Sequence, residues 1–592
     1  MTPSRIERLP FDAEEVRTWG RRDRAHTDWP VVYVLDGDQR QARPAVYVGE
    51  TLNAAARMKQ HLANASKREA GLTTIRVVID DRFNKSVCLD LESHLIRWLA
   101  GDGRFTVLNG NEGITDAAYF DRDLYRESFR DIFEQLRADG VFERSIPQIE
   151  NSDLFKLSPF KALTNDQAAA VEDILEGLFA DLETGVDSTA VVQGQPGTGK
   201  TIVAIFLMKL IADIRDHDEN DEVQPDSIFA DLFVPEHRAR LQDFRMALVV
   251  PQQSLRLSIR KVFKKTPKLD PSMVLSPYDV GKAEEPFDLL IVDETHRLNQ
   301  RANQSSGMLN RDFIEINKRL FGADDLSKTQ LDWIKARSSH RILLVDGEQS
   351  VRPADLPAAT LAAEVRAASA LSRRYPLLTQ MRVKAGADYV EAIRRLLRGE
   401  EGAAVSGEML GEYDLRFFDD LADMRMAILR KEEEHGLARL VAGYAWEWRS
   451  RRDPSAFDIE LDGVRLRWNS TDKDWINAPG SLDEVGSIHT VQGYDLNYAG
   501  VIIGPDLRYD PLARRLFVDR ESYRDKKGKE NNPALGISYS DDDLLQYIRN
   551  IYGVLLTRGI RGTYVYVCDP ALRGWLRERL PMGVERHEGS HA

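Results

Sequence analysis

A glycine-rich stretch at residues 189–211, TAVVQGQPGTGKTIVAIFLMKLI, limits the possible folds of this chain more than any other feature. It has the pattern of a buried apolar strand, a loop and a helix whose apolar residues recur at helical spacing. Glycines in such a loop let backbone N–H groups turn inward around phosphate, a lysine neutralises the β and γ oxygens, and a hydroxyl coordinates Mg²⁺. The residues that match G-x-x-x-x-G-K-T and its inner glycine are Gly194, Gly197, Gly199, Lys200 and Thr201. The stretch therefore predicts a nucleoside triphosphate site, with ATP and Mg²⁺ as cofactors.

A second apolar strand that ends in two acids follows about ninety residues later, in FDLLIVDETHRL at residues 287–298. In enzymes with a phosphate-binding loop, an acid at this strand end holds the magnesium ion, and a neighbouring carboxylate can orient the attacking water. We therefore assign Asp293 to the metal and Glu294 to the water. Together the two stretches predict a nucleotide hydrolase with an α/β fold.

Composition restricts the remaining function classes. With 592 residues the chain is too long for one hydrophobic core, and 42% hydrophobic with 30% charged residues is typical of a soluble globular protein. No apolar run could span a membrane and the N-terminus lacks a signal-peptide core, so we expect a cytoplasmic protein. The two cysteines, Cys88 and Cys568, are too far apart in sequence to favour a disulfide framework or a zinc site.

Net charge does not exclude a nucleic-acid partner. The formal value is −14, but an enzyme that moves along nucleic acid needs only a local basic track. Two acidic stretches, residues 213–226 and 537–543, carry much of the excess. We expect both to be solvated loops or insertions.

Further motifs along residues 157–579 resemble those of the superfamily 1 helicases, and within them a bacterial family related to the helicase-like part of the Schlafen proteins, of the group III type. The matching segments occur in family order as LTNDQ, ALVVPQQSL, ILLVDGEQS, LLTQMRV, HTVQGYDLNYAGVIIG and GVLLTRG. The resemblance implies that Gln167 reads adenine, that Arg382 and Arg558 contact the γ-phosphate, and that other residues couple hydrolysis to strand movement. These coupling residues are Gln349, Gln492, Gly493 and Asp495.

Each of these motifs has a structural explanation when taken alone, since a QGY can be a turn and an arginine can be a surface ion-pair partner. Two departures from the family bear on the mechanism. Asp495 stands where many helicases have glutamate, and the segments 255–287 and 383–489 are short compared with the inserted subdomains of processive members. Translocation or a nucleic-acid-gated ATPase therefore fits as well as strand separation.

The N-terminal region begins with a predicted hairpin, VVYVLDGDQRQARPAVYVGET, at residues 31–51. A helix should follow, with Arg57 and His61 four residues apart and hence on one face. IRVVID is predicted to be another strand, VCLDLESHLIRWLAG another helix, and TVLNGNEG a terminal turn.

This order resembles the GIY-YIG nuclease domain, with V-V-Y in place of the first G-I-Y. The resemblance places Tyr33, Tyr47, Gly49, Arg57, His61, Glu92 and Asn109 in the motif. It implies that a tyrosine acts as general base or proton relay, that Arg57 clamps phosphate, and that Glu92 holds one Mg²⁺. The alternative is an ordinary half-buried hairpin with a solvated arginine and a surface acid.

The predicted fold class is α/β, with a small GIY-YIG-like nuclease domain followed by two RecA-like lobes. The predicted domains are the nuclease at 1–115, a helical connector at 116–156 that packs on a motor lobe, and the lobes at 157–375 and 376–592. We expect an ATP-dependent nuclease whose motor engages nucleic acid, with DNA favoured over RNA, and a role in bacterial defence would suit it. The alternative is a regulatory ATPase whose N-terminal fold binds nucleic acid without cutting. A partner protein or a homo-oligomer stays open.

Overall fold

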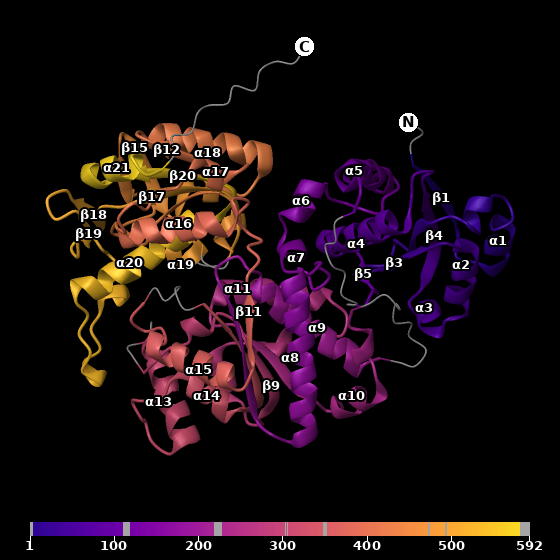
Figure 1. Ribbon diagram of the computed structural model, residues 1–592, viewed down its shortest axis with the longest axis horizontal. Coiled ribbons are helices and arrows are strands. Elements are labelled where there is room, and N and C mark those ends of the chain that lie inside the picture. The colour runs from indigo at the N-terminus through magenta and orange to yellow at the C-terminus, as the bar shows by residue number, and fades with distance from the viewer. Residues whose placement is uncertain are drawn as a thin grey trace, which may run out of the picture. The chain divides into compact units, whose positions relative to one another are not determined.

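A computed structural model describes residues 4–110, 119–217, 228–301, 304, 306–346, 352–471, 474–491 and 494–580 of the chain (Figure 1). The chain divides into two compact units, which are described separately. Unit 1 comprises residues 1–185, 201–246 and 258–274, and unit 2 comprises residues 186–200, 247–257 and 275–592. None of the described helices is both long enough and apolar enough to cross a membrane.

Within its described residues, unit 1 contains a five-stranded sheet of order β1-β4-β2-β3-β5. The strands are β1 (Arg5–Pro10), β2 (Val31–Gly37), β3 (Ala45–Thr51), β4 (Leu72–Ile79) and β5 (Thr106–Val107). The predicted hairpin is confirmed, because β2 and β3 pair antiparallel with Tyr33 opposite Gly49. The segment predicted as a terminal turn instead begins with β5, which pairs parallel with β3. Strand β1 was not predicted.

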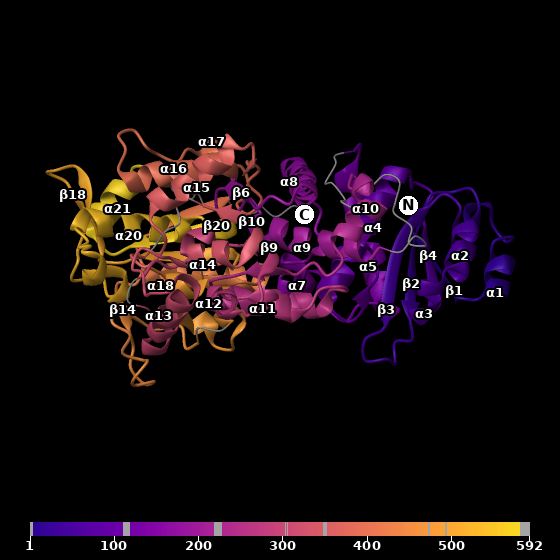
Figure 2. The same ribbon diagram turned by 90° about the horizontal axis from the view of Figure 1, so that it is seen from below.

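Helices cover both faces of this sheet (Figures 1 and 2). They are α1 (Ala13–Trp19), α2 (Ala54–Ala63), α3 (Ala65–Glu69) and α4 (Lys85–Asp102). Successive side chains of a strand point to opposite faces, so Val31, Tyr33 and Leu35 join a core with Met58 of α2. Val32 and Val34 belong to the other core, which contains α4. This alternation directs the Tyr33 side chain towards the helix that carries Arg57 and His61.

The connector helices complete the N-terminal core, which corrects the prediction that they pack on a motor lobe. They are α5 (Arg122–Ala138), α6 (Ile146–Glu150) and α7 (Asp153–Lys156). Phe133 and Ile149 lie in the same core as Trp98 of α4. At Gly101 a Cβ would come within 2.7 Å of Ile149 and 2.8 Å of Phe155, so the helices approach closely there. Because α4 is apolar on the side away from the sheet as well, it needs the connector to cover it.

Unit 1 also contains helices from the middle of the chain, namely α8 (Asn165–Thr184), most of α9 (Lys200–Arg215), α10 (Pro235–Arg240) and the end of α11 (Gln253–Lys265). The acidic stretch predicted as a loop from residue 213 starts inside α9. Asp213 is buried there and forms an ion pair with Lys209 one turn earlier. A carboxylate that is paired at i,i+4 spacing can stay inside a helix, which sequence polarity alone does not reveal. Residues 218–227 lie outside the described part of the chain.

The first sheet of unit 2 has the order β11-β6-β10-β9-β7-β8 over the described residues. Its strands are β6 (Ser188–Gly194), β7 (Met246–Val249), β8 (Val274–Leu275), β9 (Phe287–Val292), β10 (Ser338–Val345) and β11 (Arg374–Leu377). Strand β10 lies between β6 and β9 and is parallel to both. The helices that accompany it are α12 (Pro277–Lys282), α13 (Gly307–Phe321), α14 (Gln330–Ala336) and α15 (Ala358–Ala370). Strand β11 ends at Leu377, beyond the boundary expected at residue 375.

The second sheet of unit 2 has the order β12-β20-β17-β13-β16-β15-β14, again over the described residues. Its strands are β12 (Asp414–Phe418), β13 (Ala438–Ala442), β14 (Ile459–Leu461), β15 (Val464–Trp468), β16 (Glu484–Ser487), β17 (Leu496–Ile503) and β20 (Gly559–Val567), and β18 (Leu507–Asp510) pairs with β19 (Arg515–Val518). The helices are α16 (Gly386–Arg398), α17 (Gly407–Leu410), α18 (Leu421–His435), α19 (Ile488–Val491), α20 (Asp541–Leu556) and α21 (Pro570–Arg577).

The acidic stretch at residues 537–543, predicted as a solvated loop, contains the start of α20. Ser540 caps the helix through the backbone N–H of Asp543, and Asp541 begins the first turn. Acids are favoured at this end because the helix N-terminus carries partial positive charge. The stretch is therefore a helix-start signal.

Candidate functional site

The phosphate-binding loop joins β6, which ends at Gly194, to α9, which begins at Lys200. Gly197 and Gly199 have φ angles of 87° and 79°, in the left-handed region that favours glycine. A Cβ at Gly197 would also collide with the Gln380 side chain. The loop therefore needs glycine at these positions, and its backbone can follow a bound phosphate closely.

The Lys200 side chain is buried inside its own loop. Its Nζ donates to the backbone oxygens of Gly194 at 2.7 Å and Gln195 at 3.0 Å, and it lies 3.5 Å from Asp346 Oδ2. These contacts hold the Lys200 ammonium group where phosphate oxygens are expected. Its N–H groups can therefore donate to a bound phosphate in place of the backbone oxygens. Thr201 follows at the first turn of α9 and is half-buried.

Asp293 and Glu294 follow the end of β9. Because β6, β10 and β9 are parallel neighbours, their carboxyl ends meet at one edge of the sheet, near Lys200 and Asp346. Asp293 is fully buried and its Oδ1 accepts the backbone N–H of Glu294 at 2.9 Å. Asp346 belongs to the quoted stretch ILLVDGEQS but was not selected from the sequence, although an acid after an apolar strand is the same signal that identified Asp293.

Glu294 has a constrained backbone and a strongly perturbed carboxyl group. Its φ of 49° is rare for a residue with a side chain, and such strain is concentrated at functional sites. Burial alone would raise the pKa of the Glu294 carboxyl, but His296, Lys200 and Arg297 outweigh it and hold that pKa below its usual value. The His296 Nε2 lies 3.0 Å from Glu294 Oε2. Glu294 is therefore an ionised acceptor at neutral pH.

Two arginines from later motifs reach the same region of unit 2. Arg382 follows β11 and pairs with Asp495, Nε to Oδ1, at 2.5 Å. Arg558 is buried and donates through Nη1 to the Tyr494 oxygen at 2.8 Å, while its Nε has no hydrogen-bond partner among the described residues. Burial lowers the pKa of Arg558 to about 9, with a further contribution from Arg382, whereas Asp495 and Glu294 act in the opposite direction. The two arginines and Glu294 thus share one electrostatic environment.

Three of the predicted coupling residues, Gln349, Gln492 and Gly493, lie outside the described residues. Gln167 is described, and its amide caps helix α8. The Thr164 backbone N–H donates to Gln167 Oε1 at 3.0 Å, and the Gln167 N–H donates back to Thr164 Oγ1 at 3.4 Å. This reciprocal cap accounts for the LTNDQ pattern locally, and adenine recognition by Gln167 stays a prediction.

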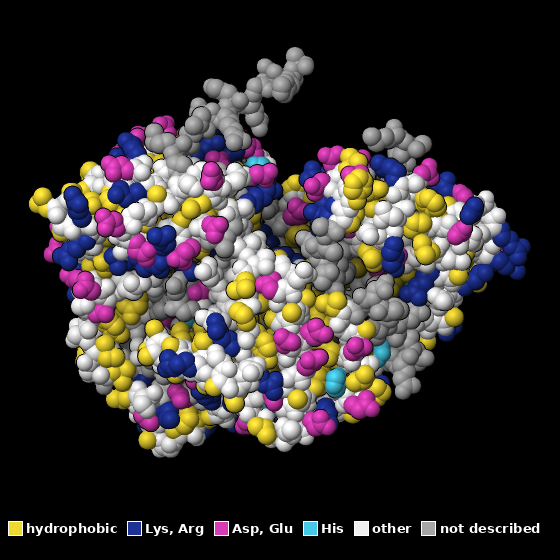
Figure 3. All heavy atoms as spheres, viewed as in Figure 1, with side chains coloured by type: hydrophobic (Ala, Val, Ile, Leu, Met, Phe, Trp, Pro, Cys, Tyr) yellow, Lys and Arg dark blue, Asp and Glu magenta, His cyan; other side chains and the backbone are white. Residues whose placement is uncertain are grey.

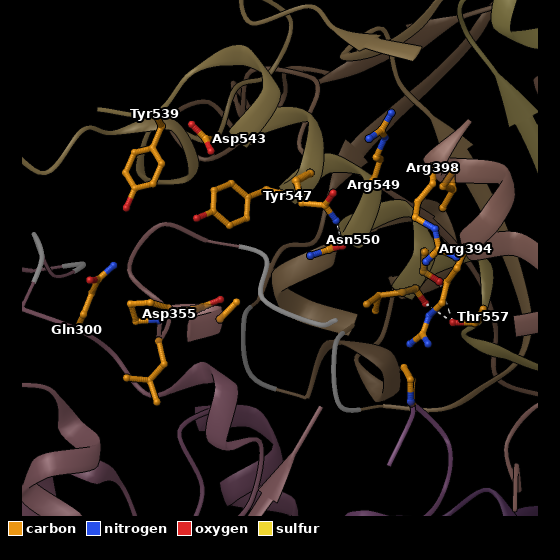
Figure 4. A pocket seen from close by; sticks show the side chains of 18 of the residues that line it. Gln300, Asp355, Arg394, Arg398, Tyr539, Asp543, Tyr547, Arg549, Asn550 and Thr557 are labelled. Atoms are coloured by element: carbon orange, nitrogen blue, oxygen red, sulfur yellow. Dashed lines mark hydrogen bonds between the residues drawn. The ribbon is translucent and has the colours of Figure 1, made fainter. Parts of the chain in front are cut away.

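A cavity of about 620 Å³ borders the phosphate-binding loop at Pro196, within unit 2. Arg394 and Arg398 of α16 line it together with Tyr547 and Asn550 of α20. Figure 4 shows Tyr539 and Tyr547 on one side, with Gln300 and Asp355 across from them. The volume is within the range of small-molecule sites.

The predicted residues of the N-terminal domain meet around Tyr33, in unit 1. Tyr33 is fully buried, and its hydroxyl lies 2.8 Å from His61 Nε2 and 3.3 Å from Arg57 Nε. Gly49 is opposite on β3, and a Cβ there would overlap the Tyr33 hydroxyl. The motif glycine is therefore required to make room for the first tyrosine. The Tyr47 ring lies 6.3 Å from that of Tyr33, centroid to centroid.

Burial determines the protonation of this group. Burial raises the pKa of Tyr33 well above its usual value. Burial, followed by Lys67 and Arg57, lowers the pKa of His61 to about 3. At neutral pH Tyr33 is therefore a phenol that shares a hydrogen bond with a neutral His61 while it accepts from Arg57. This geometry suits a proton relay better than a tyrosinate base.

The other predicted members of the cluster have different environments. Glu92 of α4 is buried, and its charge is a minor contribution to the raised pKa of Tyr33. Asn109 bonds the backbone of Val48 on both sides, with Oδ1 accepting at 3.1 Å and Nδ2 donating at 2.8 Å, which extends the sheet edge. Lys67, which was not predicted, places its Nζ 2.9 Å from the centre of the Tyr47 ring. The sequence hint of a role for Lys67 is that it stands next to Arg68 in a short basic run after α2.

A phosphate-binding loop, a strand-end acid pair, an arginine after β11 and an arginine before β20 define a helicase-like ATPase. The chain belongs to the Schlafen group 3 DNA/RNA helicase domain family, whose model matches residues 187–569. It is also 28% identical, over 414 residues, to the Saccharomyces cerevisiae protein described as "Uncharacterized protein YPL245W", covering 65% of this chain and 82% of that one.

The comparison with solved structures also found helicases, at low TM-scores. The arterivirus nonstructural protein 10 helicase has 14% identity and a TM-score of 0.27, over 68% of this chain and 64% of its own, just under two thirds of its length. The Pif1 helicase from Bacteroides, solved with ADP-AlF3 and single-stranded DNA, has 11% identity and a TM-score of 0.23, over 68% of this chain and 92% of its own.

Proposed function

We propose that this protein is an ATP-driven nucleic-acid motor whose N-terminal domain hydrolyses phosphodiester bonds. The observation that carries the motor part is the grouping of Lys200, Glu294, Arg382 and Arg558 in unit 2. The charges of Lys200 and Arg558 interact with Glu294, and Arg382 interacts with Arg558 and lies close to Gly197 of the phosphate-binding loop. Helicase-like ATPases need that set of groups at the γ-phosphate.

The residues at the loop fit ATP and Mg²⁺. The glycines leave the loop backbone open to phosphate, and Asp293 with Thr201 would hold the metal, which supplies charge neutralisation. Lys200 would exchange its carbonyl partners for phosphate oxygens. Glu294 would orient the attacking water, and Arg382 and Arg558 would offset the negative charge that develops on the γ-phosphate. Loss of the γ-phosphate would then release the two arginines and change the conformation of the site.

The nuclease part rests on the Tyr33 cluster. Arg57 would clamp the scissile phosphate, Glu92 would hold Mg²⁺, and Tyr33 would pass a proton to His61. DNA is the favoured substrate, with RNA as the alternative, and no described residue distinguishes them. A role in defence against foreign nucleic acid is an analogy drawn from this combination of domains.

A regulatory ATPase that senses nucleic acid is the second candidate. The low pKa of His61 favours it, because a base that is hard to protonate is a weak proton acceptor. In that case the N-terminal domain would bind a strand without cutting it.

Cleavage assays distinguish the two functions. Wild type, Lys200→Ala and Glu92→Gln would each be incubated with single- and double-stranded DNA and RNA, with Mg²⁺ or EDTA, and with or without ATP. The nuclease proposal expects Mg²⁺-dependent products that Glu92→Gln abolishes, while ATP turnover in that variant stays at the wild-type rate. Nucleic-acid-stimulated ATP turnover without any cleavage by the wild type would support the regulatory function.

A further inference from the structure

Four cations from three separate segments of unit 1 gather beside the N-terminal sheet. Arg43 lies in the loop between β2 and β3, Arg144 lies between α5 and α6, and Lys264 and Lys265 end α11. The Arg43 Nη2 donates to the Lys264 backbone oxygen at 3.0 Å, and the Lys265 Nζ donates to the Gly103 oxygen at 2.9 Å. We name these four residues the Lys264 patch.

No carboxylate of the described residues forms a side-chain ion pair with the Lys264 patch. Within the described residues, none of its four side chains forms an ion pair, and three of them are exposed. Two acids are near. Glu143 pairs with Arg104 at 3.6 Å, and the buried Asp102 accepts the backbone N–H of Arg144 at 3.0 Å. Burial, followed by Arg43, Lys264 and Arg144, lowers the pKa of Lys265, so the cations repel one another.

Local structure explains only part of this arrangement. Lysines at the end of α11 are favoured by the negative end of the helix dipole. The dipole does not explain why a hairpin arginine and a connector arginine are brought to the same place. The protein has a net charge of −14, and over most of the face in Figure 3 acidic and basic side chains are interspersed, although basic side chains also gather at its right-hand end. A cluster of unpaired cations is therefore a local exception, and a polyanion would relieve its repulsion.

We infer that the Lys264 patch binds the phosphate backbone of a nucleic-acid strand and leads that strand to the Tyr33 cluster. The path is short, because Arg43 precedes Tyr47 by four residues along the hairpin. At about 3.3 Å per residue this is roughly 13 Å, or about four nucleotides of a stacked strand. The patch contacts phosphate and not bases, so binding should be insensitive to sequence. The link to cleavage rests on the proposed nuclease function, whereas strand binding does not.

The test is the salt dependence of strand binding by the full chain, measured by anisotropy of a fluorescein-labelled single strand. Arg43→Gln/Arg144→Gln should bind roughly tenfold more weakly, and the slope of log K against log salt should fall by about 1.4, about 0.7 for each phosphate contact. Arg43→Lys/Arg144→Lys keeps the charges and should retain most of the affinity. Arg130→Gln/Arg366→Gln, which removes two exposed cations elsewhere, is the matched control and should leave the slope unchanged.

An affinity and slope of the patch variant equal to those of the control would overturn the proposal. Cleavage assays then distinguish a failure of the strand-binding proposal from a failure of the proposed nuclease function. Patch variants that lose affinity while wild type cuts nothing would support the binding surface and reject the nuclease. Patch variants that bind and cut like wild type, while Glu92→Gln cuts nothing, would reject the surface and support the nuclease. If strand binding by the patch and cleavage by the N-terminal domain are both correct, the patch variants should have a higher KM for cleavage with little change in kcat.

Discussion

Arg382 and Asp495 form an ion pair across two sheets, with Arg382 Nε 2.5 Å from Asp495 Oδ1. Arg382 follows the edge strand of the first sheet and Asp495 precedes β17 of the second. The aspartate, which the sequence resemblance marks as a shorter side chain than the glutamate of many helicases, therefore still reaches Arg382, one of the two arginines proposed to contact the γ-phosphate. We take this pair to position Arg382.

Substituting Asp495 by Asn should lower the kcat of nucleic-acid-stimulated ATP hydrolysis at least tenfold, because Arg382 would lose its ionic partner. The thermal midpoint should hardly change, because both side chains are partly solvent-exposed and such pairs contribute little stability. Asp495→Glu should retain more activity. Asp483→Asn, which breaks an exposed pair with Arg425, is the control. A kcat equal to that of the control would show that the pair has no positioning role.

Replacing Glu294 by Gln should reduce ATP turnover by about 10² to 10⁴, since the neutral amide lacks the negative charge with which the carboxylate orients the attacking water. Affinity for a fluorescent ATP analogue should stay within a few fold of wild type, because Lys200 and the loop glycines are unchanged. Equilibrium binding tests the expected ATP affinity, and steady-state hydrolysis tests the expected ATP turnover. Glu315→Gln, at an exposed position of α13, should behave like wild type. Turnover of Glu294→Gln near the wild-type rate would exclude its assignment.

Substituting Gly49 by Ala should abolish cleavage while ATP hydrolysis continues. The added methyl group would overlap the Tyr33 hydroxyl and displace it from His61 and Arg57. Gly574→Ala is the matched change, because a Cβ there meets nothing within 4 Å and alanine favours the helix. If Gly49→Ala cuts as well as Gly574→Ala does, the position of Tyr33 does not matter for cleavage.

The N-terminal domain should lose stability as pH falls from 6.5 towards 3, and His61 should contribute to that loss. The folded protein keeps His61 neutral down to a pKa of about 3, whereas the unfolded chain binds a proton below 6.5. Above pH 6.5 the group imposes no penalty, and below it the cost grows by about 1.4 kcal/mol per pH unit. The pH dependence of this stability can be measured by hydrogen exchange of peptides from β2 and α2, compared between wild type and His61→Gln. Identical pH dependence in the two proteins would contradict the low pKa.

Sequence patterns predicted the elements that carry the motor site, because their signals are local. The loop glycines, Lys200 and the acids after β9 are each fixed by neighbours in the chain. The hairpin itself was predicted, but β2 is buried along its whole length, so the apolar pattern did not show which face carries Tyr33. Patterns failed where a local signal had two meanings. The acids of residues 541–543 were expected in a solvated loop, and they begin helix α20.

What the sequence by itself determined is which residue types stand at each strand end and turn, and hence that a phosphate-binding loop exists and that Arg57 and His61 share a helix face. Only the tertiary structure decided which of them meet. An apolar face on α5 shows that the helix must be covered, but not that α4 covers it. In the same way, Asp346 became part of the Lys200 environment, and Arg43 joined Lys264, through strand order and loop placement. These contacts join residues far apart in the chain, and periodicity carries no information about such pairs.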